Sequence, residues 1–393
     1  MQRGNGLEGE PEASPPRGKW GPRVARSRMA VTTREPRLRI AVIGCGYWGS
    51  KHVRVLSCLP DVAEVVAVDL DQHARESIAA AFPAVRAFAH LEAALQQVDA
   101  VIVATPPRTH VGLAMEALRC GKHVLTEKPL ATSVAEARLL VDEARRSGLV
   151  LMVGHTFEFN PAVRELKQRI GLGELGRVYY INSSRLNLGL YRSDVNVIWD
   201  LAAHDVSIMN YLLDAVPSAV AAWGSRNAWA DVEDLAYVRL QYEELGVTGY
   251  AHVSWLDPNK VREVTVIGSK KMAIYNDLCE ERLRIFDRGV EWDEQQVAPF
   301  QQPLSYRYGD IISPHIPFEE PLSLEVRHFL GCIRESAIPL TDARNGLAVV
   351  TVLEAIDESL RTGSAVKVCM PAELNPTIQL KKMSSAGLEH TLP

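Results

Sequence analysis

Three side chains that can carry protons stand out by type and spacing. Lys128 lies between an acid and a proline in the segment VLTEKPLATS, at the end of an apolar run. Further along the chain, Asp200 and His204 are four residues apart, which places both on one face of a helix. An amine, a carboxylate and an imidazole are groups that enzymes use for proton transfer. The set predicts acid–base chemistry if the fold brings residues 128 and 200–204 together.

Each of these residues also has a structural interpretation. A lysine at a strand end can be a solvated turn residue, and a lone buried histidine usually belongs to a core. Asp200 and His204 could form half of a metal site, but no third and fourth ligands follow at a suitable spacing. We therefore predict no metal site.

A glycine-rich turn supplies a second candidate site. The segment IGCGYWGS holds the pattern G-x-G-x-x-G with two aromatic residues inside it: Gly44, Gly46, Tyr47, Trp48 and Gly49. Such glycines permit a tight turn close to a pyrophosphate at a helix N-terminus. Asp69 follows about 20 residues later, where an acid accepts a hydrogen bond from a ribose 2′-hydroxyl. An acid there repels a 2′-phosphate, so the pattern predicts NAD rather than NADP; the alternative is a glycine turn with a capping aspartate.

Strands and helices alternate around this turn. Apolar runs typical of buried parallel strands cover residues 37–44, 64–69, 99–106, 123–129 and 149–155. Helical patterns lie between them, at residues 71–82, 91–97, 109–121 and 133–148. This alternation predicts an α/β fold with a doubly wound parallel sheet, whose ligands bind at the carboxyl ends of the strands.

Further residues at those strand ends are candidates for cofactor contact: Thr105, Pro106, His110, Glu127 and Lys128. For the first three, a stiff strand–helix turn is an equally good interpretation, because Pro106 and its neighbouring proline fix the backbone.

The second half of the chain has another pattern. Strand-like runs cover residues 175–187, 246–256, 262–277 and 282–287, with few helices between them. Strand runs with few crossovers predict an α+β domain with a mostly antiparallel sheet, covered by helices on one face. Its open face suggests a homo-oligomer, either a dimer or a tetramer.

The domain prediction follows from these patterns. We expect a disordered extension over residues 1–36, a dinucleotide-binding domain over 37–155, a substrate-binding and oligomerisation domain over 156–370, and a loose tail over 371–393. The extension is rich in Pro, Gly and charge, has no apolar signal region, and contains Met29, an alternative start.

Composition restricts the class of protein. The 393 residues are 47% hydrophobic and 23% charged, with a net charge of -5, so neither nucleic acid nor a membrane is an expected partner. The six cysteines are scattered, and this distribution is typical of a reducing cytoplasm.

Taken in order, the glycine pattern, the EKP segment and the D-x-x-x-H helix in a β-rich second half resemble the Gfo/Idh/MocA oxidoreductase family, over about residues 37–368. The resemblance implies that Lys128, Asp200 and His204 line a substrate at the nicotinamide of NAD. Many members have a glycine-rich stretch before the acid, whereas this chain has DVNVIWDLAAHD. That variant, with GYWG and VSWLDPNKVR, resembles members that oxidise position 3 of UDP-N-acetylglucosamine or its uronic acid.

The resemblance also implies a division of labour. Lys128 would take the hydroxyl proton while hydride passes to the nicotinamide, and the positive ring and partial burial would favour the neutral amine. His204 would hydrogen-bond the hydroxyl or relay its proton, and Asp200 would orient the imidazole. Glu127 would contact the nicotinamide ribose or shape the turn.

Residues just ahead of the D-x-x-x-H helix could bind a small sugar or sugar-nucleotide substrate: Arg185, Asn187, Tyr191 and Arg192. Arginine suits phosphate or carboxylate, although a solvated loop with ion pairs is the alternative. His155 and Glu158 could also lie near the substrate.

Other functions remain open. They are an NAD-sensing regulator without catalysis, a dehydrogenase of inositol or free sugars, and an aldolase- or epimerase-like enzyme that oxidises its substrate transiently.

Overall fold

The computed structural model describes residues 37–189, 191, 195–228, 231–292 and 304–370. The extension and the tail that the sequence analysis expected to be disordered or loose, residues 1–36 and 371–393, lie outside the described residues. The described residues belong to one compact unit.

Within the described residues, the first sheet has six parallel strands in the order β3-β2-β1-β4-β5-β6. The strands are β1 (Leu38–Ile43), β2 (Val62–Val68), β3 (Arg86–Phe88), β4 (Ala100–Val103), β5 (His123–Glu127) and β6 (Leu151–Gly154). The helices between them are α1 (Tyr47–Cys58), α2 (Gln72–Ala81), α3 (Leu91–Leu95), α4 (His110–Arg119) and α5 (Val134–Ser147). The order reverses between β1 and β4, which is the switch point where such sheets bind ligands. The predicted doubly wound fold is confirmed.

The side chains of β1 belong alternately to two hydrophobic cores, because neighbouring residues of a strand point to opposite faces of the sheet. Ala41 and Ile43 pack on the side of α3, α4 and α5, whereas Ile40 and Val42 pack on the side of α1. The second core is completed by α8 (Pro321–Glu335), a helix from the last quarter of the chain. The sequence pattern alone did not show that α8 returns to the first sheet.

The second sheet has nine described strands in the order β14-β13-β12-β11-β7-β10-β9-β8-β15. They are β7 (Val178–Leu188), β8 (Ala219–Ser225), β9 (Leu235–Tyr242), β10 (Val247–Ser254), β11 (Leu256–Gly268), β12 (Met272–Asn276), β13 (Leu283–Trp292), β14 (Leu304–Ile312) and β15 (Val366–Lys367). Neighbouring strands are antiparallel except β7 and β10, which run parallel. The mostly antiparallel sheet that the sequence predicted is confirmed.

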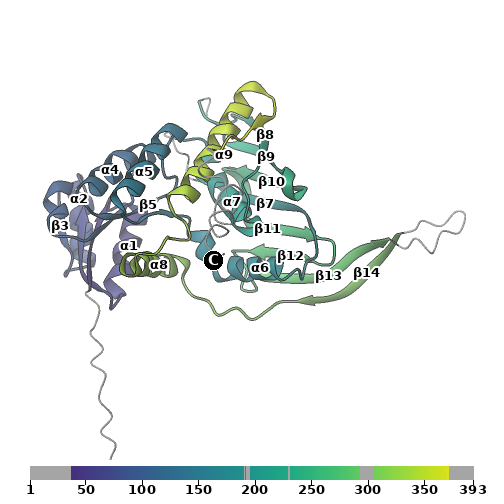
Figure 1. Cartoon of the computed structure of the whole chain (residues 1–393), viewed down its shortest axis with the longest axis horizontal. Helices are drawn as coiled ribbons and strands as arrows, with labels where there is room; N and C mark the ends of the chain where they lie inside the picture. The colour runs from purple at the N-terminus through teal and green to yellow at the C-terminus, as the bar shows by residue number, and fades with distance from the viewer. Residues whose placement is uncertain (1–36, 190, 192–194, 229–230, 293–303, 371–393) are drawn as a thin grey trace, which may run out of the picture. The chain divides into compact units, whose positions relative to one another are not determined.

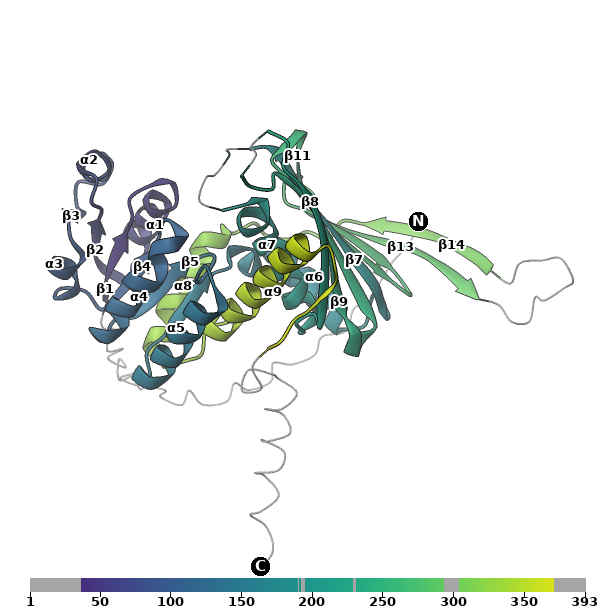
Figure 2. The ribbon, with the colours of Figure 1, turned by 90° about the horizontal axis from the view of Figure 1, so that it is seen from above.

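Helices cover one face of this sheet. Figures 1 and 2 show α6 (Pro161–Gly171), α7 (Ala203–Leu213) and α9 (Ala343–Thr362) along it. Short turns complete the described elements: η1 (Pro107–Thr109), η2 (Thr156–Phe159), the π-helical turn η3 (Ile198–Ala202) and η4 (Glu243–Leu245). In the part of the chain that the structure describes, no helix is both long and apolar enough to cross a membrane.

The glycine turn after β1 depends on two close approaches. Gly44 has a φ of +90°, and a Cβ there would lie 2.7 Å from the carbonyl oxygen of Ala104. A Cβ on Gly49 would lie 1.7 Å from the carbonyl oxygen of Gly44. The first turn of α1 can therefore pack on β1 only when residue 49 has no side chain.

We expect Gly49→Ala to lower the free energy of unfolding, by about 1–3 kcal/mol, because α1 must move away from β1. The measurement is the urea midpoint of the full chain. Gly112→Ala in α4 is the matched control, since a Cβ there meets no atom within 4 Å. The control should be neutral or stabilising by up to about 1 kcal/mol. Equal midpoints for the two variants would contradict this account of the turn.

Candidate active site

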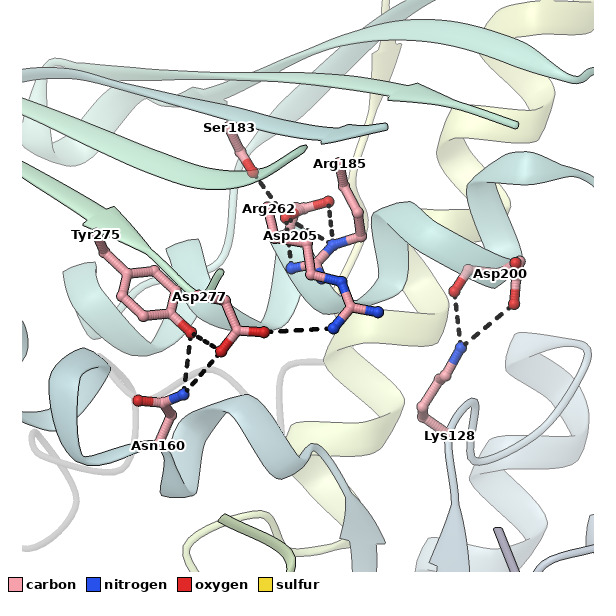
Figure 3. A network of polar contacts seen from close by, with 9 residues as sticks. All are labelled: Lys128, Asn160, Ser183, Arg185, Asp200, Asp205, Arg262, Tyr275 and Asp277. Carbon is pink, nitrogen blue, oxygen red and sulfur yellow. Dashed lines mark hydrogen bonds and ion pairs between the residues drawn. The ribbon is translucent and has the colours of Figure 1, made fainter. Parts of the chain in front are cut away.

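Lys128 follows β5 directly, and its peptide bond to Pro129 is cis. Its Nζ donates a hydrogen bond to the carbonyl oxygen of Asp200 at 2.7 Å and lies 3.7 Å from Oδ1 of the same residue (Figure 3). The lysine side chain is 11% exposed. The end of the first sheet and the start of the α7 region therefore meet at this contact, as the acid–base hypothesis requires.

Asp200 lies in η3, one turn before α7. Its Oδ2 accepts a hydrogen bond from Nε1 of Trp255 at 3.0 Å, so the carboxylate is held between the indole and Lys128. The sequence analysis expected Asp200 to orient the imidazole of His204. Asp200 contacts Lys128 and Trp255, and its role toward His204 stays a prediction.

Two imidazoles lie near the lysine. The ring of His204 is partly buried and packs edge-on against Phe157, with 5.0 Å between ring centroids. Burial, with the positive charges of Lys128 and Arg185 nearby, lowers the pKa of His204 well below its usual value. Burial, with Lys128, lowers the pKa of His155 to about 3. Both rings are therefore neutral near pH 7 and can form hydrogen bonds without carrying charge.

His155 does not reach the surface. It is 1% exposed, and neither ring nitrogen has a protein partner among the described residues. Glu127 is also buried, and its Oε1 lies 2.9 Å from Nε2 of the fully buried His52 on α1. This buried pair holds the Glu127 side chain, which directly precedes Lys128, against α1.

The glycine turn fits a dinucleotide. A Cβ on Gly46 would meet no atom within 4 Å, so open space lies above the turn. Among the described residues, no side chain caps the N-terminus of α1 and no acid occurs in its first turn. Its N–H groups and partial positive charge thus suit a pyrophosphate. Tyr47 and Trp48 are both exposed beside this space.

Asp69 lies at the edge of the same turn. Its Oδ2 accepts a hydrogen bond from the Cys45 N–H at 2.6 Å, and its Oδ1 accepts one from the Asp71 N–H at 2.9 Å. The residue is partly exposed. Each carboxylate oxygen can accept a further bond, so the geometry is compatible with a ribose hydroxyl.

His110 lies inside the protein. The residue is fully buried, and its two ring nitrogens lie 2.8 Å from the carbonyl oxygens of Pro129 and Thr105. This geometry favours the interpretation of His110 as part of a stiff strand–helix turn, and its contact with a cofactor stays a prediction. His110 connects the turn after β4 to the turn after β5. Thr105 and Pro106 themselves remain partly exposed or exposed.

Of the four residues predicted to bind substrate just ahead of the D-x-x-x-H helix, Arg185 has the clearest structural partner. Its Nε and Nη2 donate to Oδ1 of Asp205 at 3.2 and 3.0 Å, and its side chain is 6% exposed. The Tyr191 hydroxyl donates to Asp234 at 3.4 Å, and its ring packs on Trp255. Asn187 is partly buried, and Arg192 lies outside the described residues.

Arg262 is a further residue at this site that was not predicted from the sequence. This residue lies on β11 opposite Arg185 of β7, and its Nη1 contacts Oδ2 of Asp277 at 3.3 Å (Figure 3). Its segment, VSWLDPNKVR, supported only the family resemblance and no prediction about Arg262 itself. Period-two alternation with Val264 and Val266, which are buried, would have placed Arg262 on the helix-covered face.

In the described residues, no group of three or more His, Cys, Asp or Glu side chains is placed to hold a metal ion.

Comparisons with known proteins add to this geometry. A family model described as "Oxidoreductase family, NAD-binding Rossmann fold" matches residues 38–155, and one described as "GFO/IDH/MocA C-terminal domain" matches residues 163–274. The chain is 28% identical over 361 residues to D-apiose dehydrogenase of Paraburkholderia graminis, covering 86% of this chain and 92% of that protein. It is 35% identical over 255 residues to UDP-N-acetylglucosamine 3-dehydrogenase of Acidithiobacillus ferrooxidans, covering 64% of this chain and 78% of that protein.

A similar solved structure is GenD2 from gentamicin A biosynthesis in complex with NAD. The TM-score is 0.72 and the sequence identity 25%, with 85% of this chain and 97% of that chain covered.

Glu158 has an unusual environment and generates a testable prediction. It is 1% exposed and accepts hydrogen bonds from Ser207 Oγ at 2.5 Å and Asn345 Nδ2 at 3.2 Å. Burial raises its pKa from 4.5 to about 7. As the pH rises, the folded chain therefore releases this proton at a higher pH than the unfolded chain does. The stability that the proton contributes is present below about pH 4.5 and is lost as the pH rises through about 7.

We expect Glu158→Gln to remove this dependence. Relative to the unmodified protein, the variant should gain at most about 2–3 kcal/mol in free energy of unfolding between pH 5 and pH 8. Urea unfolding at both pH values measures this gain, with Glu92→Gln at an exposed position of α3 as the control. A stability difference that stays the same at both pH values would contradict the assignment.

Proposed function

Because the chain belongs to the Gfo/Idh/MocA oxidoreductase family, we propose that it oxidises a hydroxyl-bearing carbon of a sugar nucleotide, most specifically position 3 of a UDP-N-acetylhexosamine. The coarser assignment is that the chain is an NAD-dependent oxidoreductase of sugar or polyol hydroxyls. The proposal depends on one observation above all. Lys128 follows β5 directly, and its Nζ contacts Asp200. The 35% identity to a UDP-N-acetylglucosamine 3-dehydrogenase supports the finer substrate assignment.

NAD would be held by residues whose geometry fits it. The open space over Gly46 and the uncapped start of α1 suit its pyrophosphate, and Asp69 suits the hydroxyls of its adenosine ribose. Bound NAD would supply the acceptor for the hydride that leaves the substrate carbon.

Lys128 would take the proton of the reacting hydroxyl on Nζ. Two contacts to Asp200, one to the carbonyl oxygen and one to the carboxylate, hold this nitrogen in position. The carboxylate at 3.7 Å would also stabilise the ammonium that proton transfer creates. We therefore propose that Asp200 positions Lys128, and that Trp255 keeps the carboxylate in place.

His204 would act as a neutral hydrogen-bonding group. Burial and, after it, the cations nearby disfavour a positive charge on the imidazole, so the neutral ring would bind the substrate hydroxyl through one ring nitrogen. Packing against Phe157 limits its rotation.

The assembly and location are also proposals. Large aromatic side chains, Trp223, Tyr237 and Tyr250, are exposed on the face of the second sheet that α6, α7 and α9 do not cover. They support a homo-oligomer, a dimer or a tetramer, because apolar patches of this kind often lie at interfaces. All six cysteines are free, which supports a cytoplasmic location.

A free sugar or an inositol is an alternative substrate, because dehydrogenases of these compounds are equally similar to the chain. The match to D-apiose dehydrogenase covers 92% of that protein, more than the 78% covered for the sugar-nucleotide enzyme. Absorbance of the reduced cofactor, followed with NAD and a panel of UDP-sugars, free sugars, aminoglycosides and inositols, separates the two. Turnover of neutral free sugars or inositols without turnover of any UDP-sugar would contradict the sugar-nucleotide proposal.

We expect Lys128→Met to lower kcat by about 10²–10⁴, the usual contribution of a general base. NAD affinity should hardly change, because the glycine turn and Asp69 make the main cofactor contacts. Asp200→Asn should cost less, since its role is positioning. Steady-state kinetics and NAD titration measure both effects, with Lys260→Met at an exposed position of β11 as the control. A Lys128→Met enzyme with the unmodified kcat would remove Lys128 as the base.

Asp69 should set the cofactor preference. Replacement by Ser should narrow the preference for NAD over NADP by about 1–2 kcal/mol, because a charge-assisted hydrogen bond and the repulsion of a 2′-phosphate are both lost. Asp69→Asn removes the charge but keeps one acceptor oxygen, for the N–H group of either Cys45 or Asp71, so its comparison with Asp69→Ser shows how much of the change is due to charge. Calorimetric affinities for both cofactors provide the measurement. Equal affinities in the unmodified protein would refute the role.

A further inference from the structure

Two arginines lie directly opposite each other beside the candidate active site. Arg262 of β11 and Arg185 of β7 are register partners, on the face of the sheet that α7 covers. Like charges directly opposite on neighbouring strands destabilise a sheet. Both also contribute to the positive field at His204. Such a pair is favoured where negative charge, from the protein or from a ligand, lies between or beside the two guanidinium groups.

The protein neutralises the two arginines unequally. Arg185 donates to Asp205 through Nε and Nη2, and its side chain is 6% exposed. Arg262 contacts Asp277 through Nη1 at 3.3 Å, and its side chain is 38% exposed. A guanidinium has five N–H donors, so Arg262 keeps donor capacity at an accessible position.

The partner of Arg262 is itself fixed from behind. The other oxygen of Asp277, Oδ1, accepts hydrogen bonds from the Tyr275 hydroxyl at 3.0 Å and from Asn160 Nδ2 at 3.3 Å. Tyr275 and Asn160 are both almost fully buried. In Figure 3 the Arg262 guanidinium lies between this network and the side on which Lys128 and Asp200 are drawn. A group held this way loses little conformational entropy when a ligand binds.

We propose that Arg262 binds an anionic group of the substrate, a phosphate or a carboxylate, and thereby selects anionic sugars over neutral ones. The proposal rests on the proposed function and specifies its substrate class. It also replaces Arg185 as the anion-binding residue, because Asp205 takes Nε and Nη2 of Arg185 and the Arg185 side chain is only 6% exposed. Planar guanidinium geometry matches both anions in a bidentate way, which a lysine does not reproduce.

The test uses competition, so it does not depend on the natural substrate. At saturating NAD, inorganic pyrophosphate, UDP and D-glucuronate are titrated as inhibitors against the best turned-over substrate of the panel. Arg262→Gln, Arg262→Lys and the unmodified full chain are compared. Arg239→Gln, an exposed position on the opposite face of the same sheet, is the control.

We expect inhibition that is competitive with the sugar, and an inhibition constant that rises about 10- to 100-fold in Arg262→Gln. Arg262→Lys should recover part of the loss, and Arg239→Gln should match the unmodified chain. The kcat for a neutral substrate should change little, which a merely structural role of Arg262 would not predict. Stronger inhibition by UDP identifies a diphosphate as the anion, and stronger inhibition by D-glucuronate identifies a carboxylate.

Two results would overturn the proposal. One is the absence of sugar-competitive inhibition of the unmodified chain by any of the three anions. The other is equal inhibition of the unmodified chain and of Arg262→Gln. Either result is distinct from failure of the proposed function, which is judged by whether the unmodified chain turns over any UDP-sugar.

Discussion

The contact between Lys128 and Asp200 joins two parts of the chain that no local pattern links. Lys128 owes its place to the end of β5, a buried strand of the first sheet, and Asp200 owes its place to η3 beside the second sheet. In the proposed mechanism Lys128 depends on Asp200, because a flexible lysine must be held before it can accept a proton from one defined atom. Much of the surrounding structure keeps Lys128 and Asp200 at a fixed distance from each other.

His110 is one residue that holds the turn at Lys128 in place. Its buried ring lies between the carbonyl oxygens of Thr105 and Pro129, so the turns after β4 and β5 cannot shift independently. Glu127 is fixed in turn by His52 of α1, the helix that begins at the glycine turn. The cofactor turn and the lysine are thus connected through buried hydrogen bonds, which are strong in a low-dielectric interior.

The sequence predicted strands that are mostly apolar and buried, such as β1, β2 and β5, because burial on both faces leaves a nearly continuous pattern. It missed β3, which has three residues and no apolar run, and β14, whose residues are almost all exposed. β9 has clear alternation at Ala236, Val238 and Leu240, a signal that a strict count would have found. At the site, residue types and order predicted that Lys128, Asp200 and His204 lie together, which the structure shows, whereas their roles stay predictions. The partners of Asp200 and Arg185 could not be read from spacing, because each pairing joins a strand of the second sheet to a helical segment and has no fixed sequence spacing.

The return of α8 to the first sheet has a consequence for how the chain acquires its structure. Val326 and Phe329 complete the core against Ile40 and Val42, which precede them by most of the chain. During synthesis the first sheet therefore leaves the ribosome with one apolar face incomplete, and it stays so until the last quarter of the chain follows. Contacts of such high sequence separation slow folding and prolong the exposure of apolar surface. Although its strands and helices alternate locally, the dinucleotide-binding half of this protein can complete its hydrophobic core only when nearly the whole chain is present.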